Sequence, residues 1–550
     1  MLIALVPEAD SAGRLRKISE DGSPAGPVVE TADLPAAVSS MERLHKPRWV
    51  WASTPEVYPD LLAAGVRVER CHDLTLTEGL LLAHAGRHRE PRELPAAIAR
   101  VLGLPPPPDA GPRKRDAQPT LFEPVPASLP GGVDPLDAVG RVFGAQQANP
   151  LFDQLRLLVA ADCASWLAAC EMTFHGLPWR EDVHLSLLED LLGPRTPPGV
   201  RPRKLAALAD RIVAAFGGRA VNPDAPGSIV QAFAWEGIDI PSARAWVLRS
   251  LDHPAVAPLL EYKELQRLWT AHGWSWLDAW VSDGRFRPEY VVGGVVSGRW
   301  ASNGGAALQI PRILRTAIRA DPGHLLVAAD AAQLEPRVLA ALSGDQRLAE
   351  ACGDDDLYAA IASDSFQGER PKAKIAMLSA MYGGTSGEAG PLLAVLRRRF
   401  PSAVGYVESA AQAGEQGRMV RSRLGRTSPT PSDAWRELTG AADDAGDSAA
   451  RSRQAARNWG RFTRNFVVQA SAADWTAALL AVLRTHLPPD AHLVFFQHDE
   501  VLVHCPAPAA EAACDAITSA AREATRLLFG DTQVRFPMRA VPVESYADAK

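Results

Sequence analysis

Long apolar runs and paired cysteines are both missing from this chain of 550 residues. No apolar run approaches the roughly 18 residues that a membrane span needs, and the first apolar stretch, Leu2 to Val6, meets Pro7 and Glu8 with no basic flank before it. We therefore expect neither a signal peptide nor a membrane partner. The six cysteines are scattered with no C-x-x-C spacing, which argues against a disulfide framework and favours reduced thiols in the cytoplasm.

Lysine and net positive charge are also scarce. Only eight of the 58 basic residues are lysines, and the formal net charge is −6. This balance excludes a protein that coats nucleic acid through bulk charge, although it is compatible with a channel lined locally by cations. What the chain has instead is 47% hydrophobic residues, enough to build large cores in three or four domains at roughly 150 residues each.

The composition changes along the chain and predicts several domains. Residues 1–104 alternate short apolar runs (Leu2 to Val6, Trp49 to Ala52, Val66 to Val68) with Ala- and Leu-rich stretches, which predicts a small α/β domain. Residues 105–134 are rich in proline, contain the basic run Arg113-Lys114-Arg115, and predict a linker. The rest is described by three patterns: mainly helical over 135–290, strand-like over 290–340 and 490–550, and helical with many arginines over 345–485.

Tryptophan gathers towards the end of the first helical region, at positions 246, 269, 274, 276 and 280, with another at 300. Such large side chains can pack in a core or stack on nucleic-acid bases. Core packing is the favoured interpretation for this group.

A buried-strand pattern, His324 to Ala329, ends on Asp330 and is followed by Pro336, which suits the first turn of a helix. A carboxylate at the end of an apolar strand is well placed to bind a metal ion. Taken alone, Asp330 is better explained as an aspartate of the turn that ends the strand.

Two apolar runs flank His498-Asp499 and predict a β-hairpin, with Glu500 at the start of its second strand. Ordinary turn chemistry is one explanation of these polar residues. Against it, two adjacent carboxylates repel each other unless a cation neutralises them. If the fold brings Asp330 and Asp499 together, they form a carboxylate site of the two-metal, phosphoryl-transfer type.

Four residues spaced by four (Arg370, Lys374, Leu378 and Tyr382) form one slowly winding stripe on a predicted helix that Pro371 opens and Gly383-Gly384 ends. The stripe is about 18 Å long, the scale of an extended nucleoside triphosphate. Cations at a helix N-terminus oppose the macrodipole and favour an anion there. A solvated basic face is the alternative, but the apolar end of the stripe counts against it.

These three segments resemble motifs A, B and C of the family A DNA polymerases, the DNA polymerase I type. Motif A is Asp330-Ala-Ala-Gln333-Leu-Glu335-Pro-Arg337, motif B is the Arg370 to Gly383 stripe, and motif C is His498-Asp499-Glu500. Further segments resemble family motifs: Glu261 to Leu265, Ser297 to Ser302 with Arg299, Leu308 to Pro311, and the spaced set Arg461, Asn465 and Gln469. The resemblance covers about 400 residues, from 140 to the C-terminus.

The resemblance implies an α+β multidomain fold shaped as a right hand, preceded by a small α/β domain similar to a 3′-5′ exonuclease (residues 1–104). The implied subdomains are a thumb over 135–290, a palm over 291–345 and 465–550, and fingers over 346–464. The expected protein is a monomer in the cytoplasm, at the nucleoid, that works in DNA repair or replication on primer-template DNA and deoxynucleoside triphosphates.

The resemblance also implies roles for single residues. Asp330 and Asp499 would hold two Mg²⁺ ions, or Mn²⁺, with the Ala331 carbonyl as a further ligand and Glu500 in support. The implied nucleotide-binding residues are Arg370 and Lys374 on the triphosphate, Tyr382 at the template-base position, Glu335 as a steric gate, and Gln333, Tyr358 and Leu378. Lys374 would also protonate the departing pyrophosphate. The implied DNA-binding residues are Arg299, Arg461, Asn465, Gln469 and His498.

The chain departs from the family pattern at three places. Ala331-Ala332 replaces Tyr-Ser in motif A, Leu378 replaces the aromatic residue that packs on the incoming base, and Tyr358 replaces a histidine that contacts the triphosphate. A non-catalytic DNA-binding scaffold would explain these changes but predicts loss of a metal aspartate, and both are present. A two-metal nuclease would not explain the stripe.

The N-terminal domain is predicted to lack exonuclease activity. That chemistry needs a D-x-E pair on the first strand and two later aspartates, and residues 1–134 contain no D-x-E. Glu8-Ala9-Asp10 has the reverse order and follows Pro7. Asp73 and Asp137 are better explained as turn or helix-cap residues.

Overall fold

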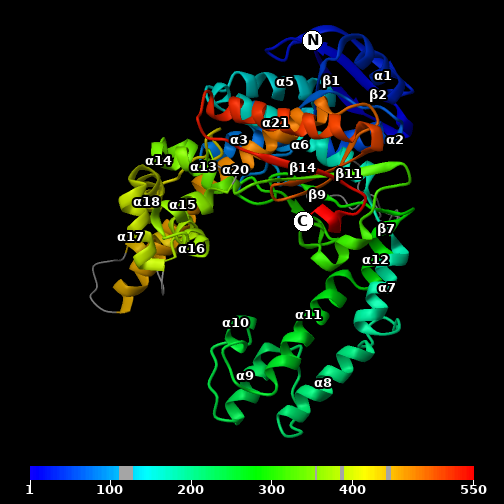
Figure 1. The fold of residues 1–550 in the computed structure, drawn as a ribbon. Helices are drawn as coiled ribbons and strands as arrows, with labels where there is room; N and C mark the ends of the chain where they lie inside the picture. The colour runs from blue at the N-terminus through cyan, green and yellow to red at the C-terminus, as the bar shows by residue number, and fades with distance from the viewer. Residues whose placement is uncertain (111–127, 354–355, 385–388, 441–446, 550) are drawn as a thin grey trace.

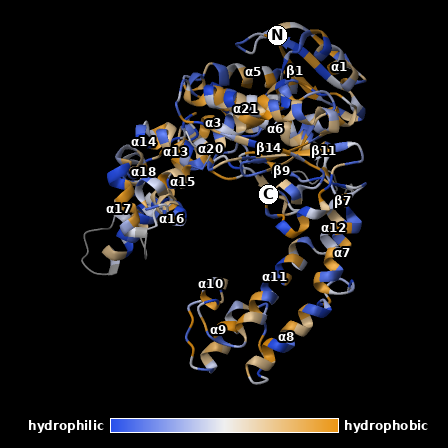
Figure 2. Ribbon diagram, in the orientation of Figure 1, coloured by the Kyte–Doolittle hydropathy of each residue, from blue (hydrophilic) through white to orange (hydrophobic). Residues whose placement is uncertain are grey.

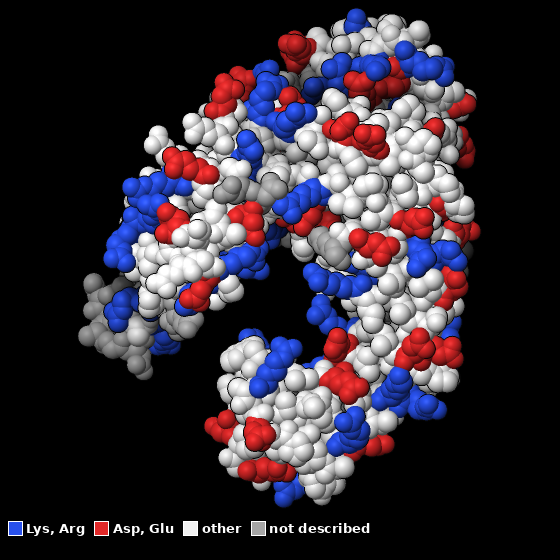
Figure 3. All heavy atoms as spheres, viewed as in Figure 1, with Lys and Arg blue, Asp and Glu red and all other residues white. Residues whose placement is uncertain are grey.

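A computed structural model describes residues 1–110, 128–353, 356–384, 389–440 and 447–549. Figure 1 shows an upper body that holds the two largest sheets and most of the longest helices, and two projections below it. One projection carries α13 to α18, and the other is an arm that carries α7 to α12. The two enclose a wide hollow, which the space-filling view also shows (Figure 3).

The N-terminal unit is built on a five-stranded sheet of order β3-β2-β1-β4-β5. Its strands are β1 (Leu2–Pro7), β2 (Gly13–Ile18), β3 (Pro24–Thr31), β4 (Arg48–Trp51) and β5 (Arg70–Asp73). The neighbours β1, β4 and β5 run parallel, whereas β1, β2 and β3 are antiparallel. Its helices are α1 (Leu34–His45), α2 (Thr54–Ala63), α3 (Leu74–His84) and α4 (Leu94–Val101).

Two of the three strands predicted here are confirmed, as β1 and β4. The prediction at Val66 to Val68 is wrong, because these residues form the loop before β5. The strands β2 and β3 were not predicted, because basic residues interrupt β2 and Pro24, Gly26 and Pro27 interrupt β3.

The core of this unit extends past the proline-rich segment. Side chains of α5 (Pro135–Gln147), among them Val139 and Phe143, share a buried cluster with Ala4 of β1 and Val50 of β4. The first half of α6 (Phe152–His175) packs in the same way against α2 and β5. Residues 135 to about 170, which the sequence assigned to the thumb, therefore lie in the upper body. Most of the predicted linker, including Arg113-Lys114-Arg115, lies outside the described residues.

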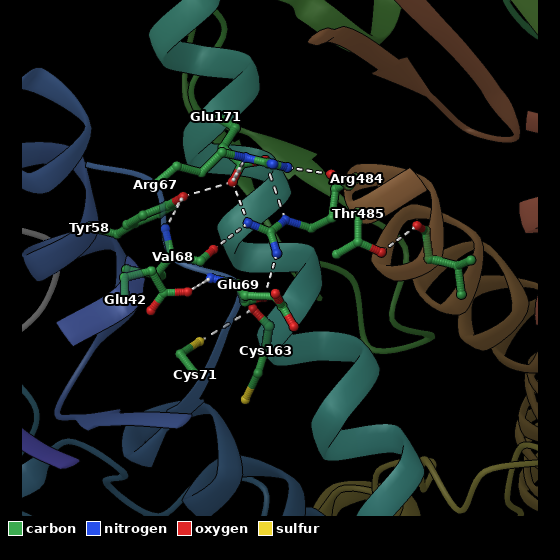
Figure 4. A network of polar contacts seen from close by, with 11 residues as sticks. Glu42, Tyr58, Arg67, Val68, Glu69, Cys71, Cys163, Glu171, Arg484 and Thr485 are labelled. Atoms are coloured by element: carbon green, nitrogen blue, oxygen red, sulfur yellow. Dashed lines mark hydrogen bonds and ion pairs between the residues drawn. The ribbon is translucent and has the colours of Figure 1, made fainter. Parts of the chain in front are cut away.

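A network of polar contacts joins the N-terminal unit to α6 and α20 (Figure 4). The Arg484 guanidinium, 2% exposed, donates to the Val68 and Glu69 carbonyl oxygens at 2.8 and 2.6 Å and pairs with the Glu171 carboxylate. Glu171 also accepts from Tyr58 at 2.7 Å and pairs with Arg67 at 3.1 Å. The buried charges of this network are therefore compensated by partners from the N-terminal unit, α6 and α20.

The arm below the sheet consists of α7 (Glu181–Leu192), α8 (Arg203–Ala215), α9 (Pro226–Trp235), α10 (Ala245–Leu248), α11 (Val256–His272) and α12 (Trp274–Trp280). At its base lies a three-stranded sheet of β6 (Leu177–Pro178), β8 (Arg285–Phe286) and β7 (Val281–Ser282). The predicted core packing is confirmed for Trp274 and Trp276. It is wrong for Trp246, which is 66% exposed on the short helix α10.

The central sheet is antiparallel with order β12-β13-β11-β14. Its strands are β11 (His324–Ala331), β12 (His492–Gln497), β13 (Glu500–Pro506) and β14 (Met538–Val543). The helix α20 (Asp447–His486) contacts both α6 and α21 (Ala510–Phe529), and these two helices contact the sheet; Figure 1 shows all three above it. A short pair, β9 (Tyr290–Val291) and β10 (Ala301–Ser302), lies near its edge.

The second projection contains α13 (Leu334–Ser343), α14 (Gln346–Ala351), α15 (Leu357–Ser365), α16 (Arg370–Tyr382), α17 (Ala389–Arg399), α18 (Pro401–Glu415) and α19 (Asp433–Gly440). The helix α20 runs unbroken for 40 residues from this lobe into the upper body and crosses the predicted boundary at 465. Glycines at its crossing with α18 bring the backbones close, because a Cβ at Gly414 would lie 2.0 Å from the Thr463 hydroxyl oxygen.

Both α6 and α20 contain apolar stretches that are long enough to cross a membrane, contrary to the expectation from the sequence. Isolated polar residues such as Asp162 interrupt these stretches and hide them in the sequence. Within the fold, 67% of the α6 window and 78% of the α20 window are buried, which is typical of core helices. Figure 2 shows the apolar residues of both helices inside the upper body.

Candidate functional site

The structure brings Asp330 and Asp499 to neighbouring strand ends in the middle of the central sheet. Asp330 is the next-to-last residue of β11 and lies opposite Glu500 of β13. His498 and Asp499 form the two-residue turn between β12 and β13, with His498 at φ +59°. The Ala331 amide donates to the Asp499 carbonyl oxygen at 3.1 Å. The predicted hairpin and the predicted juxtaposition are thus both confirmed.

The Asp499 carboxylate is buried and lies close to the charge of Asp330. Burial, and then the charge of Asp330, raise the pKa of Asp499 to about 7. A cation beside them would favour the charged form. Among the described residues, no group of three or more His, Cys, Asp or Glu side chains could hold a metal ion, so any ion at this pair would need further oxygen ligands from the backbone or from a bound molecule.

Glu500, 5% exposed, lies beside Asp330 and Asp499, and its carboxylate faces an arginine. Its carboxylate is 3.6 Å from the Arg315 guanidinium, which stacks 4.1 Å above the ring of Tyr546. Burial and then the charge of Glu500 raise the pKa of the Tyr546 hydroxyl. The structure therefore places Glu500 opposite Asp330 and next to the Arg315 guanidinium. Arg315 carries no motif signal and was missed by sequence reasoning.

A pocket of about 330 Å³ opens next to Asp499, between the central sheet and α16. Eight of the predicted residues line it: Arg299, Gln333, Glu335, Tyr358, Leu378, Tyr382, His498 and Asp499. Trp300, Phe496 and Met381 also line it and were not predicted, because each reads as a core residue in the sequence. Thr476 of α20 lines the wall as well, two turns beyond Gln469.

The helix α16 presents the predicted stripe beside this pocket. Arg370 and Lys374 are exposed, Leu378 is half-buried and Tyr382 is 39% exposed. The helix starts at Arg370 and ends at Gly383, which adopts φ +73°, as the sequence predicted. In this arrangement the cationic start of the stripe lies towards solvent and its apolar end lines the pocket.

Arg370 is held by the start of α15. Its Nε donates to the Asp356 carboxylate at 2.7 Å, and its guanidinium lies 5.6 Å from the centre of the Tyr358 ring. Gln333 joins the same corner, because its carbonyl oxygen accepts from the Leu357 amide at 2.9 Å. Burial and then the charge of Glu335 raise the pKa of Tyr358 to about 12, so the phenol is neutral.

Glu335 lies between a cation and a phenol. Its carboxylate pairs with Arg299 and accepts a hydrogen bond from the Tyr382 hydroxyl. Burial and this hydrogen bond raise the pKa of Tyr382. The carboxylate thereby links the loop before β10, α13 and α16 across the mouth of the pocket.

The stripe of Arg461, Asn465 and Gln469 lies on α20 near the end of α16. A Cβ at Gly383 would be 3.1 Å from the Arg461 side chain, and neighbouring Arg464 donates to the Ala380 carbonyl oxygen at 3.1 Å. Arg461 is exposed, whereas Asn465 and Gln469 are half-buried. The Asn465 carbonyl oxygen is buried and has no hydrogen-bond partner within the part of the chain that the structure describes.

Three acidic residues that were considered as exonuclease ligands are engaged in other contacts. Glu8 lies beyond the end of β1 and pairs with Arg14 at 2.7 Å. Asp73 caps α3 by accepting from the Leu76 amide at 2.8 Å, which confirms its predicted role. Asp137 lies in the first turn of α5 and pairs with Arg16 at 2.6 Å.

Two relatives that match this chain in sequence are DNA polymerase I proteins. The DNA polymerase I of Chloroflexus aurantiacus is 28% identical over 322 residues, which are 51% of this chain and 32% of that protein. The thermostable DNA polymerase I of Thermus aquaticus is 27% identical over 305 residues, 49% of this chain and 34% of the relative. The chain thus spans about a third of the length of these relatives.

A solved structure shows the same fold over the whole chain. The POL domain of Pol1 from M. smegmatis, in complex with DNA primer-template and dNTP, has a TM-score of 0.71 and covers 100% of this chain and 95% of that one, at 19% identity. This likeness confirms the predicted α+β polymerase architecture. The sequence model of DNA polymerase family A matches residues 227–541, more than half of the chain. The protein is therefore a member of DNA polymerase family A.

Proposed function

We propose that this protein is a template-directed DNA polymerase that adds deoxynucleotides to a primer 3′-hydroxyl. The observation that carries the proposal is the pair of Asp330 and Asp499 beside a pocket lined by the apolar end of the α16 stripe. Its substrates are then primer-template DNA and deoxynucleoside triphosphates. The proposed setting is DNA repair or replication by a monomer in the cytoplasm, at the nucleoid.

We infer that the carboxylate pair would hold two divalent ions together with oxygen atoms of the backbone and of the substrate. Family A polymerases generally use such ions, and Mg²⁺ is commonly bound by one or two carboxylates together with substrate phosphates. Asp330, Asp499 and the Ala331 carbonyl would hold them, with Glu500 in support. When bound, the ions would supply charge neutralisation at the attacking and departing oxygens. Mg²⁺ is the proposed metal, and Mn²⁺ is an alternative.

The side chains around the pocket would position the nucleotide. Arg370 and Lys374 supply the positive charge for a triphosphate, and Lys374 can donate a proton to the departing pyrophosphate. The side chains of Leu378, Tyr358 and Gln333 line the pocket in which the nucleotide would lie. Glu335, fixed by Arg299 and Tyr382, narrows the pocket where a ribose 2′-hydroxyl would lie. Positioning and charge compensation of this kind account for most of phosphoryl-transfer catalysis.

The subdomain names follow from the proposed function. The arm of α7 to α12 would be the thumb, the lobe of α13 to α19 the fingers, and the central sheet the palm. In that arrangement Arg299, Arg461, Asn465, Gln469 and His498 would contact the primer-template.

We further infer that the N-terminal unit has no 3′-5′ exonuclease activity. Three of the acidic residues that could serve as ligands, Glu8, Asp73 and Asp137, are engaged in ion pairs or in a helix cap. The fourth, Asp10, lies beyond the end of β1 at φ +54°. Incubation with a 3′-mismatched primer and Mg²⁺, without nucleotides, should leave the primer intact. Shortening that is lost in Glu8→Gln but kept in Asp330→Ala would contradict this inference.

Primer extension with all four deoxynucleotides tests the main proposal. The wild type should extend, and Asp330→Ala or Asp499→Ala should abolish extension while primer-template affinity, measured by fluorescence anisotropy, stays nearly unchanged. Binding without extension by the wild type would instead indicate a non-catalytic scaffold. Metal-dependent cleavage of DNA that is lost in Asp330→Ala or Asp499→Ala would instead indicate a nuclease.

A further inference from the structure

Arg426 belongs to a buried group of three charges close to the pocket. Its guanidinium pairs with the Asp162 carboxylate of α6 at 2.9 Å and with the Asp474 carboxylate of α20 at 3.1 Å. The three residues are 7%, 2% and 0% exposed. Burying three charges costs a large desolvation free energy, so such a group is weak evidence for added stability. It does, however, fix the position of the guanidinium.

The segment that carries Arg426 is held on both sides. The Leu424 amide donates to the Asp474 carboxylate at 3.2 Å. The Thr427 carbonyl oxygen lies 3.0 Å from Nε2 of His88, a residue of the N-terminal unit. Although this segment lies between α18 and α19 in sequence, its contacts therefore attach it to the upper body.

The Arg426 guanidinium packs on the backbone of Gly298, where a side chain would not fit. A Cβ at Gly298 would lie 2.3 Å from Nε and 2.5 Å from Cζ of Arg426, and Gly298 adopts φ +84°, which favours glycine. The next residue is Arg299, whose guanidinium pairs with the Glu335 carboxylate. Gly298, Arg299 and Glu335 line the pocket. Arg426 thus touches the lining of the pocket from its buried side.

We propose that Arg426 is a positioning residue for sugar selection, because it fixes Gly298 and thereby holds Arg299 against the Glu335 carboxylate. This inference rests on the proposed polymerase function, in which Glu335 narrows the pocket where a ribose 2′-hydroxyl would lie. Arg426 acts through Gly298 and Arg299 and does not itself touch the nucleotide. A lysine does not replace it, because an ammonium group lacks the planar, multiple donors of a guanidinium.

The test compares single-turnover incorporation of one deoxynucleotide and of the matching ribonucleotide by the full chain. Arg426→Lys should lower the ratio of the two kcat/KM values, deoxynucleotide over ribonucleotide, at least about fivefold, because moving a positioned group by roughly 1 Å can change rates about a hundredfold. The kcat/KM for the deoxynucleotide alone should fall by less than the ratio does. A variant that is merely destabilised would lose activity on both nucleotides equally.

A double-mutant cycle with Arg299→Ala tests the route of the effect. Arg299→Ala alone should also lower the ratio. Adding Arg426→Lys to Arg299→Ala should lower it little further, because both changes release the same carboxylate and are therefore not additive.

Arg484→Lys is the matched control. Arg484 is another buried arginine that pairs with a buried carboxylate of α6, Glu171, but its further contacts are to the Val68 and Glu69 carbonyl oxygens of the N-terminal unit. Thermal melting compares the stability of the two lysine variants. Arg484→Lys should keep the wild-type ratio even where its melting temperature falls as much as that of Arg426→Lys.

The outcomes separate this inference from the proposed function. A wild type that incorporates neither nucleotide overturns the proposed function, and the inference with it. An active Arg426→Lys with the wild-type ratio overturns the inference alone, and so does an equal change of the ratio in Arg484→Lys or an additive double variant. If Arg426→Lys does not fold, Asp162→Asn removes one of the two charges that hold Arg426, and the same fall in the ratio decides.

Discussion

At the scale of single residues, the two lysines of α16 differ in their surroundings. Lys374 is exposed on the stripe, whereas Lys372 pairs with Glu369 at 2.7 Å. We expect Lys374→Ala to lower kcat/KM for nucleotides by at least about tenfold, because a charged hydrogen bond is worth roughly 1.5–3 kcal/mol. Single-turnover kinetics at varied nucleotide concentration measure this change. Lys372→Ala is the control, and an equal effect of both variants would contradict the assignment.

His184 makes the stability of the arm sensitive to acid. It is buried, its Nδ1 accepts from Trp179 at 3.3 Å, and its Nε2 lies 3.0 Å from the His272 carbonyl oxygen, so the neutral ring is satisfied. Burial lowers the pKa of His184 to about 4, below the roughly 6.5 of an unfolded chain. The unfolded state therefore binds more protons in this window, and stability is present above pH ~6.5 and is lost as the pH falls towards 4.

Urea unfolding at pH 7 and pH 5 measures this effect. The free energy of unfolding should fall on acidification by up to roughly 2 kcal/mol from this histidine. His184→Phe should show a shallower pH dependence than the wild type, even if it is less stable at pH 7. A pH dependence that His184→Phe leaves unaltered would show that the imidazole titrates normally in the fold.

The candidate site shows which residues a sequence can reveal. Asp330, Asp499 and the α16 stripe were predictable, because their chemistry and spacing leave a pattern. Arg315 and Trp300 were not, since a lone arginine or an apolar residue acquires a role only through its neighbours in space. Likewise, the ion pair of Glu335 with Arg299 joins segments that only the fold brings together.

At the scale of elements, the crossing of α18 and α20 depends on a missing side chain. We expect Gly414→Ala to destabilise the protein by about 1–3 kcal/mol, because its Cβ would lie 2.0 Å from the Thr463 hydroxyl oxygen. Gly405→Ala on the same helix is the control. A Cβ there meets nothing within 4 Å, so it should stabilise by about 0.5–1 kcal/mol.

Chemical unfolding of both variants measures these changes, and Gly414→Ala combined with Thr463→Ala should recover part of the loss. Stabilisation by Gly414→Ala alone would mean that the two helices are farther apart than described. Sequence predicted the hairpin and α16 well because their boundaries carry turn residues. It missed the crossing and the length of α20, because close helix contact is a property of two segments at once.

At the scale of the whole molecule, Arg484 fixes the N-terminal unit to the rest of the fold (Figure 4). Arg484→Met should destabilise the chain by roughly 3–5 kcal/mol, because it leaves the buried Glu171 carboxylate with less compensation. Arg526→Ala, which breaks the exposed pair with Glu523, should leave the melting temperature nearly unchanged. Calorimetric melting compares the two, and equal costs would show that the network is not a stabilising contact.

The domain division was the least predictable feature at this scale. Composition placed a boundary at the proline-rich segment, but α5 and α6 on its far side complete the core of the N-terminal unit. A linker is visible in sequence because of its residue types. The sequence does not reveal which core a helix belongs to, because any apolar helix of suitable length can cover a sheet.

The unbroken course of α20 has a mechanical consequence. At 40 residues it is a rod about 60 Å long, and it carries the Arg461 stripe within the same piece that Arg484 holds at its far end. A helix without a proline or a break in its hydrogen bonds does not act as a hinge. If the helices α13 to α17 move during the proposed reaction, the pivots therefore lie in the loops that join them, while α20 and the α18 helix packed on it move as one rigid piece.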